Sequence, residues 1–197
     1  MSSVVLVDSG GANIGSVKYA LARLGVEADI CADGDEIQRA DKVIMPGVGA
    51  AGAGMVRLRE NGLTELIPSL TQPVLGICLG MQLMFENSEE DETPALNIFR
   101  GGATRLPDRP GLRVPHMGWN RLEQVKPCVL LSGLGDDAYA YFVHSFALPV
   151  NEDTVASALH GSAFCAVAQR DNFYGTQFHP ERSAQVGAKI LENFLSL

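Results

Sequence analysis

The first half of the chain alternates short apolar runs with helical patterns. The runs occupy residues 4–8, 27–31, 42–46 and 73–78. Between the first two, apolar residues recur at helical spacing behind Asn13, a candidate N-cap, and the pattern stops at Gly25. This alternation is typical of a parallel sheet whose strands are joined by crossover helices.

The second half has longer strand patterns separated by turns. These patterns span residues 138–148, 154–161 and 164–179, and an amphipathic helix is expected over 183–197. The sheet should therefore become mixed in this half. With no linker and no internal repeat in the sequence, we predict one α/β domain over residues 1–197, with a central, mostly parallel mixed sheet flanked by helices.

Composition excludes several classes of function. A formal net charge of -8 argues against a nucleic-acid partner, because binding to phosphates relies on clustered Lys and Arg. The longest uncharged stretch, residues 73–85, is broken by Gly, Cys and Gln, and residues 1–8 lack a basic segment before their apolar run. We expect neither a membrane span nor a signal peptide.

The cysteines and histidines are scattered along the chain. None of the four cysteines forms a C-x-x-C pair, so the sequence predicts neither a disulfide framework nor a zinc knuckle. No pair of the four histidines has a spacing that would bind a metal from one helical face. We expect a cytoplasmic protein without metal or cofactor.

One of these cysteines lies in a distinctive motif. Residues 76–80 read Gly-Ile-Cys-Leu-Gly, the thiol counterpart of the G-x-S-x-G nucleophile elbow, between a buried strand and an expected helix over 79–88. Glycines on both sides make room for so sharp a turn, and the N–H groups at the helix start favour a thiolate. Cys78 is therefore the candidate nucleophile, whereas Cys31, Cys128 and Cys165 are interpreted as small buried apolar residues.

A cysteine nucleophile needs a base that carries its proton. His179 lies at the end of the expected strand in the sequence Phe-His-Pro-Glu, and positions i and i+2 of a strand share one face. Glu181 can then bond the ring of His179 and fix its tautomer, as in a catalytic triad. The alternative is a structural histidine capped by a neighbouring glutamate.

Residues 47–52 match the G-x-G-x-x-G pattern of dinucleotide-binding loops. We reject a dinucleotide site because the loop follows the third strand, Pro46 precedes it and no acidic residue ends a strand about 20 residues later. A glycine-rich loop near Cys78 has another use. The backbone N–H groups of Gly47, Val48 and Gly49 can stabilise the oxyanion of a tetrahedral intermediate.

Three segments together resemble the class I, triad-type glutamine amidotransferases. PGVG, LGICLGMQ and QFHPE occur in that family's order and at about its spacing, and the resemblance covers the whole chain. It implies glutamine hydrolysis to glutamate and ammonia by Cys78, His179 and Glu181. The elbow motif and the Phe-His-Pro-Glu segment indicate the same three residues.

The resemblance also implies substrate contacts. Gln82 lies four residues beyond Cys78, on the same face of the expected helix, where the family binds glutamine. His144 and Ser145 match a segment whose main chain contacts the α-amino and α-carboxylate groups of the substrate. Otherwise this segment is simply a buried strand.

Within the family, residues 115–120 (PHMGWN) and residues around Asn13 are most similar to glutaminase subunits of histidine biosynthesis. That similarity implies a separate (β/α)8-barrel cyclase as partner, in a heterodimer, with Asn13, Trp119 and Asn120 at the interface. If this similarity is left aside, a lone Trp such as Trp119 is more often a core residue. Phe146 and the loop 9–11 depart from the pattern of many relatives.

Other functions remain open at this level. The chain can be an amidotransferase of another pathway, a free-standing cysteine hydrolase with the same elbow, or a catalytically idle subunit that only holds a cyclase. The complete set of Cys78, Gln82, His179 and Glu181 argues against the idle subunit, which has no physical use for a nucleophile elbow.

Overall fold

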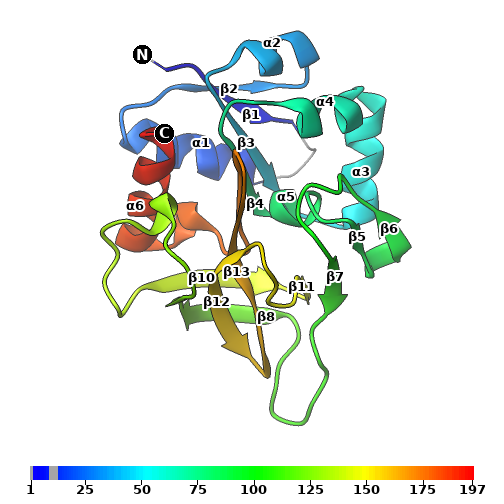
Figure 1. The fold of residues 1–197 in the computed structure, drawn as a ribbon, viewed down its shortest axis with the longest axis vertical. Helices are drawn as coiled ribbons and strands as arrows, with labels where there is room; N and C mark the ends of the chain where they lie inside the picture. Colours follow the sequence, from blue (N-terminus) through cyan, green and yellow to red (C-terminus); the bar gives the residue numbers. More distant parts are fainter. Residues whose placement is uncertain (1, 9–12) are drawn as a thin grey trace.

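The computed structural model describes residues 2–8 and 13–197. Its largest sheet joins a parallel block to an antiparallel one (Figure 1). In spatial order the parallel strands are β2 (Ala28–Cys31), β1 (Val4–Val7), β3 (Lys42–Gly47), β4 (Val74–Cys78) and β14 (Phe173–Thr176). The predicted strands of the first half are confirmed and lie together in this block.

Beyond β14 the neighbouring strands pair antiparallel. They follow in the order β13 (Ser162–Arg170), β12 (Thr154–His160) and β9 (Glu123–Gln124). The mixed, mostly parallel sheet expected from the sequence is thus confirmed. Because parallel strands end at a common edge, the residues that follow β3, β4 and β14 come close together there.

The parallel strands are buried on both faces, and their side chains alternate between two hydrophobic cores. In β1, Val4 and Leu6 belong to one core, and Val5 and Val7 to the other. Helices cover both faces (Figure 1). The first core is covered by α1 (Ile14–Arg23) and α6 (Ala184–Leu195), and the second by α2 (Gly34–Arg39), α3 (Ala51–Glu60) and α4 (Leu63–Ser69).

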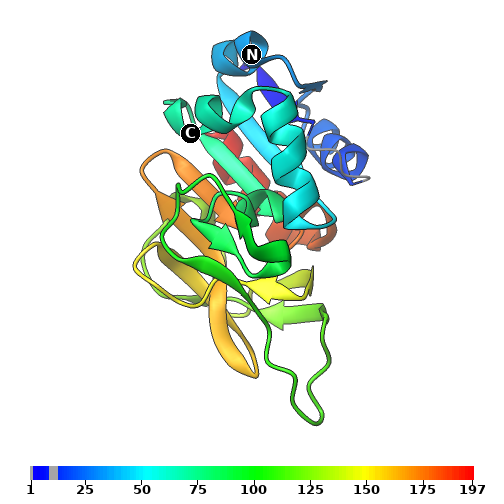
Figure 2. The same cartoon turned by 90° about the vertical axis from the view of Figure 1, so that its right-hand side faces the viewer.

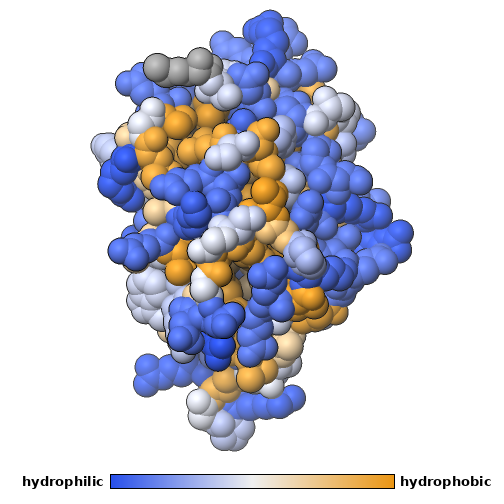
Figure 3. Space-filling model, turned by 60° about the vertical axis from the view of Figure 1, so that its left-hand side comes forward, coloured by the Kyte–Doolittle hydropathy of each residue, from blue (hydrophilic) through white to orange (hydrophobic). Residues whose placement is uncertain are grey.

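The side of the molecule that carries α1 and α6 shows a band of apolar residues between hydrophilic flanks (Figure 3). Between these helices lies a cavity of about 370 Å³. The helices are short: in residues 2–8 and 13–197, none has the length and apolar character needed to cross a bilayer.

Smaller sheets lie beside the main one (Figures 1 and 2). An antiparallel ribbon consists of β8 (His116–Arg121) and β10 (Tyr139–His144). The other sheet orders β11 (Phe146–Ala147), β7 (Gly102–Arg105), β5 (Asn87–Ser88) and β6 (Thr93–Pro94). Short 3-10 turns are η1 (Glu90–Glu92), η2 (Val129–Leu131) and η3 (Pro180–Arg182).

The helix expected over residues 79–88 is wrong in length. Helix α5 spans only Leu79–Gln82. The carbonyl groups of residues 83–85, which would continue it, instead accept hydrogen bonds from the backbone N–H groups of residues 96–99. A segment distant in sequence thus ends the helix after one turn.

Two expected strands are also divided. The pattern over 164–179 is a hairpin of β13 and β14, with Asp171 at φ 51° in its turn. The pattern over 138–148 breaks at Ser145 between β10 and β11. The closing helix is confirmed as α6, with Ile190 and Phe194 fully buried.

Candidate active site

The expected elbow at Cys78 is present in full. Cys78 is the last residue of β4 and has φ 54° and ψ -109°, a conformation that costs a non-glycine residue free energy. A β-carbon on Gly76 would lie 2.7 Å from the Met81 backbone, and one on Gly80 would lie 1.8 Å from the Met45 carbonyl oxygen. Both glycines of the motif are therefore needed for close backbone packing, as the sequence predicted.

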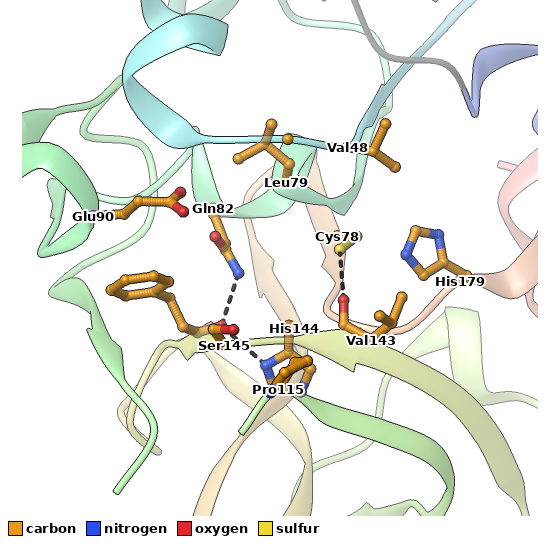
Figure 4. A pocket seen from close by; sticks show the side chains of 12 residues that line it. Val48, Cys78, Leu79, Gln82, Glu90, Pro115, Val143, His144, Ser145 and His179 are labelled. Atoms are coloured by element: carbon orange, nitrogen blue, oxygen red, sulfur yellow. Dashed lines mark hydrogen bonds between the residues drawn. The ribbon is translucent and has the colours of Figure 1, made fainter. Parts of the chain in front are cut away.

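Cys78 opens into a cavity of about 370 Å³ at the common edge of the parallel strands (Figure 4). The thiol lies 3.9 Å from the carbonyl oxygen of Val143, in the strand that passes beneath it. The cavity is lined by Val48, Gly49, Cys78, Leu79, Gln82, Glu90, Pro115, Val143, His144, Ser145, Phe146 and His179.

His179 lies beside Cys78 in this cavity (Figure 4). Its Nδ1 atom is 2.8 Å from Oε1 of Glu181, and both side chains are almost completely buried. The predicted contact is present, but the expected strand geometry is wrong. The strand ends at Thr176, and Glu181 turns back to the ring through η3.

The ring of His179 is held in place through its backbone as well. The His179 N–H donates to the carbonyl of Tyr141, and the hydroxyl of Ser183 donates to the carbonyl of His179 over 2.7 Å. Burial opposes a charge on the ring, but interactions with Cys78 and Glu181 outweigh it and raise the pKa of His179 to about 10. His179 is therefore poised as an imidazolium between the thiol and the carboxylate.

Asn13 reaches the same two residues from the start of α1. It occupies the expected N-cap position, but its side chain makes no capping hydrogen bond. Instead its Nδ2 atom donates to Oε1 of Glu181 and lies 3.2 Å from Nδ1 of His179. The sequence did not place Asn13 here, because nothing local links residue 13 to residue 181.

Two glutamine side chains connect the thiol to the cavity wall. The amide of Gln177 donates to the Cys78 sulfur over 3.8 Å, and the amide of Gln82 donates to Oε1 of Gln177 over 3.0 Å. Gln82 also donates to the carbonyl of Phe146 over 2.8 Å. Gln177 was not among the residues predicted from the sequence, although its position two residues before His179 was a signal.

The whole chain matches a known family. Residues 5–197 match the model of "Glutamine amidotransferase class-I". The chain belongs to this family. Proteins named imidazole glycerol phosphate synthase subunit HisH are close relatives. Those of Xanthomonas campestris pv. campestris and Xylella fastidiosa are 52% and 50% identical, each over 100% of this chain and 98% of its own length. That of Haemophilus influenzae is 51% identical over 99% of this chain and 98% of its own.

Solved structures agree on the amidotransferase fold. One titled as a glutamine amidotransferase has a TM-score of 0.76 at 20% identity and covers 98% of both chains. The structure of PurLQS from Thermotoga maritima has a TM-score of 0.78 at 18% identity, over 100% of this chain and 99% of that one. The elbow at Cys78 thus lies in a class I glutamine amidotransferase fold.

The structure brings most of the predicted site residues of this amidotransferase together. Val48, Gly49, Gln82, His144 and Ser145 all line the cavity that holds Cys78 and His179. Gly47 lies deeper, where an added β-carbon would be 2.8 Å from the backbone nitrogen of Gly80.

Polar or backbone groups of Glu90 and Leu79 are among the parts of the cavity wall that the sequence did not predict. Glu90 presents a carboxylate whose Oε2 accepts a hydrogen bond from the backbone of Ala51, at the start of α3 (Figure 4). Leu79 follows the nucleophile, in the position whose backbone N–H commonly contributes to an oxyanion hole. The elbow motif itself was a signal for Leu79, whereas Glu90 comes from a turn without any motif.

Trp119 and Asn120, both assigned to a partner interface, point to opposite faces of β8. Trp119 is 54% exposed on β8 and its ring contacts Tyr141 edge-on. Asn120 points to the other face, where its amide donates to the carbonyl of Leu159 over 2.9 Å. The loop 9–11 and Ala12 lie outside the described residues.

Proposed function

We propose that this chain is the glutaminase subunit of an imidazole glycerol phosphate synthase. It hydrolyses glutamine to glutamate and ammonia, and supplies the ammonia to a (β/α)8-barrel cyclase of histidine biosynthesis. One observation carries the proposal. A single cavity has the thiol of Cys78 and the ring of His179 at one end, and an amide and a carboxylate, those of Gln82 and Glu90, at the other (Figure 4). The family and the HisH relatives support it.

The first step is acyl transfer to Cys78. The imidazolium of His179 holds Cys78 as a thiolate, whose electron pair attacks the side-chain amide carbon of glutamine. As the tetrahedral intermediate collapses, His179 gives its proton to the amide nitrogen and ammonia leaves. A thioester between Cys78 and the glutamyl group remains, while Glu181 keeps the ring oriented through Nδ1.

Backbone N–H groups stabilise the oxyanion of this intermediate. Leu79 at the elbow and Val48 lie above the thiol (Figure 4), and Gly49, in the loop of Val48, lines the same cavity. Gly47 lets this loop pack against α5. Loss of one such donor typically lowers kcat by about 10²–10³.

Water completes the cycle. His179, neutral after giving up its proton, takes a proton from water, and the hydroxide oxygen attacks the thioester carbonyl. The C–S bond breaks, glutamate leaves, and the proton on His179 restores the ion pair with the Cys78 thiolate. The atoms balance as one glutamine and one water converted to glutamate and ammonia.

The polar end of the cavity sets the orientation of glutamine. Both amide hydrogens of Gln82 are bonded, to Phe146 and Gln177, so the atom it can offer to substrate is the acceptor Oε1. Together with the Glu90 carboxylate, this acceptor suits the α-ammonium group of an amino acid. The main chain at His144 and Ser145 contacts the α-carboxylate and α-amino groups.

The cyclase docks on the outer face of the ribbon β8–β10. Trp119 is an exposed aromatic anchor of the kind common at interfaces, with Met117 64% exposed beside it on the same face. The proposed complex is a heterodimer in the cytoplasm, in which residues 1–197 act as one glutaminase domain and the ammonia-consuming nucleotide binds to the barrel. This cyclase yields imidazole glycerol phosphate and aminoimidazole carboxamide ribonucleotide.

Glutamate release tests the proposal. The purified chain is assayed alone, then with a barrel cyclase, and then with the cyclase and its nucleotide ligand. We expect a large rise on adding the liganded cyclase. Brisk activity that the cyclase leaves unchanged would favour another pathway or a free hydrolase, and no activity in any mixture would favour an idle subunit.

Substitution of the nucleophile separates the two reactions of the complex. Cys78→Ser is expected to abolish glutamine hydrolysis, whereas cyclisation with added ammonia continues at the wild-type rate. Glutaminase activity retained by this variant would remove Cys78 from the mechanism.

A further inference from the structure

A row of hydrogen bonds leads from β8 to the wall of the cavity. Nδ2 of Asn120 lies 3.3 Å from Nε2 of His116, and Nδ1 of His116 lies 3.0 Å from Nε2 of His144. Nδ1 of His144 lies 2.9 Å from the carbonyl oxygen of Phe146. That carbonyl also accepts the amide of Gln82, so the row ends on a residue of the glutamine site.

The direction of these hydrogen bonds can be derived from the cavity end. A carbonyl oxygen only accepts, so Nδ1 of His144 must carry a hydrogen. In a neutral ring Nε2 then holds a lone pair, and it accepts from Nδ1 of His116. Nε2 of His116 is left with a lone pair in turn, and it requires a donor.

The other end gives the same direction independently. Oδ1 of Asn120 accepts the backbone N–H of Arg121 over 2.9 Å, and Nδ2 donates to the Leu159 carbonyl over 2.9 Å. These contacts fix the orientation of the amide, so Nδ2 faces His116 as a donor. The donor and acceptor roles derived from the two ends therefore agree. Asn120 donates to His116, His116 donates to His144, and His144 donates to the carbonyl of Phe146.

Both rings have surroundings that keep them neutral. His116 and His144 are 6% and 5% exposed. Around them pack the rings of His160, Phe142 and Phe164. Burial lowers the pKa of His116 to about 4 and that of His144 to about 3.

We propose that Asn120, His116 and His144 form a directional hydrogen-bond chain that fixes the bend at 144–146 and the Phe146 carbonyl, and thereby positions Gln82 for the substrate. This inference rests on the proposed glutaminase function. His116 and Asn120 lie outside the cavity and are positioning residues. These hydrogen bonds also connect the inner face of β8 to the substrate site, while the outer face of the same strand carries Trp119.

Nitrogen NMR of the wild-type protein tests the arrangement without any activity. At pH 7 both His116 and His144 are expected as neutral Nδ1–H tautomers, with pyridine-type shifts at Nε2. Asn120→Asp replaces the donor with an acceptor, so His116 should change to an Nε2–H or a charged ring. An Nε2–H tautomer at either ring of the wild type, or an unchanged His116 in Asn120→Asp, would overturn the proposal.

Kinetics with the liganded cyclase tests the positioning role. His116→Phe keeps a packed ring but interrupts the hydrogen-bond chain. Asn120→Ala removes the first donor of that hydrogen-bond chain and leaves both histidine rings in place. For each we expect KM for glutamine to rise about tenfold, with kcat changed less than threefold. His160→Phe is the matched control, because its ring stacks on His116 at 4.2 Å but lies outside the chain, and its KM should not change.

The outcomes separate the two proposals. If wild-type protein hydrolyses no glutamine, the proposed function fails, whatever the tautomers show. If wild type is active but KM is unchanged in Asn120→Ala and His116→Phe, the positioning role fails. An equal rise in His160→Phe would assign the effect to ring stacking and also overturn it.

Discussion

The α-carbon of Gly80 lies against the carbonyl oxygen of Met45, so close that a β-carbon would fall 1.8 Å from that oxygen. This contact joins β3 to the first turn after the nucleophile. The contact fixes the position of Cys78 relative to the loop of Val48 and Gly49, which lines the same cavity.

Gly80→Ala should therefore deform the elbow. We expect a loss of about 3 kcal/mol in the free energy of unfolding, because backbone on both sides has to move, and a loss of most glutaminase activity. Denaturant unfolding measures the first and glutamate release the second. Gly15→Ala in α1 is the matched control: nothing lies within 4 Å of its β-carbon, so stability should be unchanged or slightly higher. Equal stability of the two variants would contradict this account of the elbow.

Asn13→Ala should impair chemistry more than binding. The variant loses the hydrogen bond to Glu181, so the carboxylate and the His179 ring are less well held. We expect kcat to fall about tenfold, the effect of one hydrogen bond to a charged group, while KM for glutamine stays near wild type. Steady-state kinetics with the liganded cyclase provides both values.

Because Asn13 also begins α1, the same variant needs a structural control. Its side chain makes no capping hydrogen bond, so the free energy of unfolding should fall by less than about 1 kcal/mol. A rise in KM at constant kcat would assign Asn13 to the partner surface or to substrate binding rather than to Glu181.

The raised pKa of His179 predicts how its contribution to stability varies with pH. Interactions with Cys78 and Glu181 raise this pKa from 6.5 to about 10 against the opposing effect of burial. The charged ring therefore contributes full stability below pH 6.5, and this contribution is lost as pH rises through 10. The gap in unfolding free energy between wild type and His179→Gln should be wider at pH 6 than at pH 10.5. The same gap at both values would exclude a charged His179.

The lowered pKa values of His116 and His144 change the free energy of unfolding with pH in the opposite direction. Between pH 6.5 and 4 the unfolded chain binds protons that the folded protein excludes, so stability falls as pH falls. Each histidine contributes a slope of up to about 1.4 kcal/mol per pH unit. His116→Phe should lose less stability than wild type between pH 7 and pH 5 in urea unfolding. Parallel losses would show that folding does not lower the pKa of His116.

Much of this site could be predicted because its strongest signals are local. The G-x-C-x-G motif predicts both the turn at Cys78 and the close packing that the structure shows. The spacing of His179 and Glu181 allows their contact through either an extended chain or the η3 turn. The contact could therefore be predicted although the backbone geometry expected for it was wrong.

The contacts that were missed join segments distant in sequence. Asn13 meets Glu181 across 168 positions, and Gln177 meets Cys78 across 99. The composition of residues 79–88 favours a helix, but the N–H groups of residues 96–99 bind the carbonyls that would extend it. Helix propensity depends on the residues of the segment alone and takes no account of hydrogen bonds from a distant segment. The helix was therefore predicted too long.

The chain has four unpaired cysteines, and of these Cys78 is the one that lines the cavity beside His179. An electrophile shaped like glutamine would therefore label a single sulfur, while Cys165, completely buried, stays unmodified. Each folded subunit then takes up one equivalent of reagent. The elbow thus allows intact sites in any preparation to be counted by mass spectrometry, without a turnover assay.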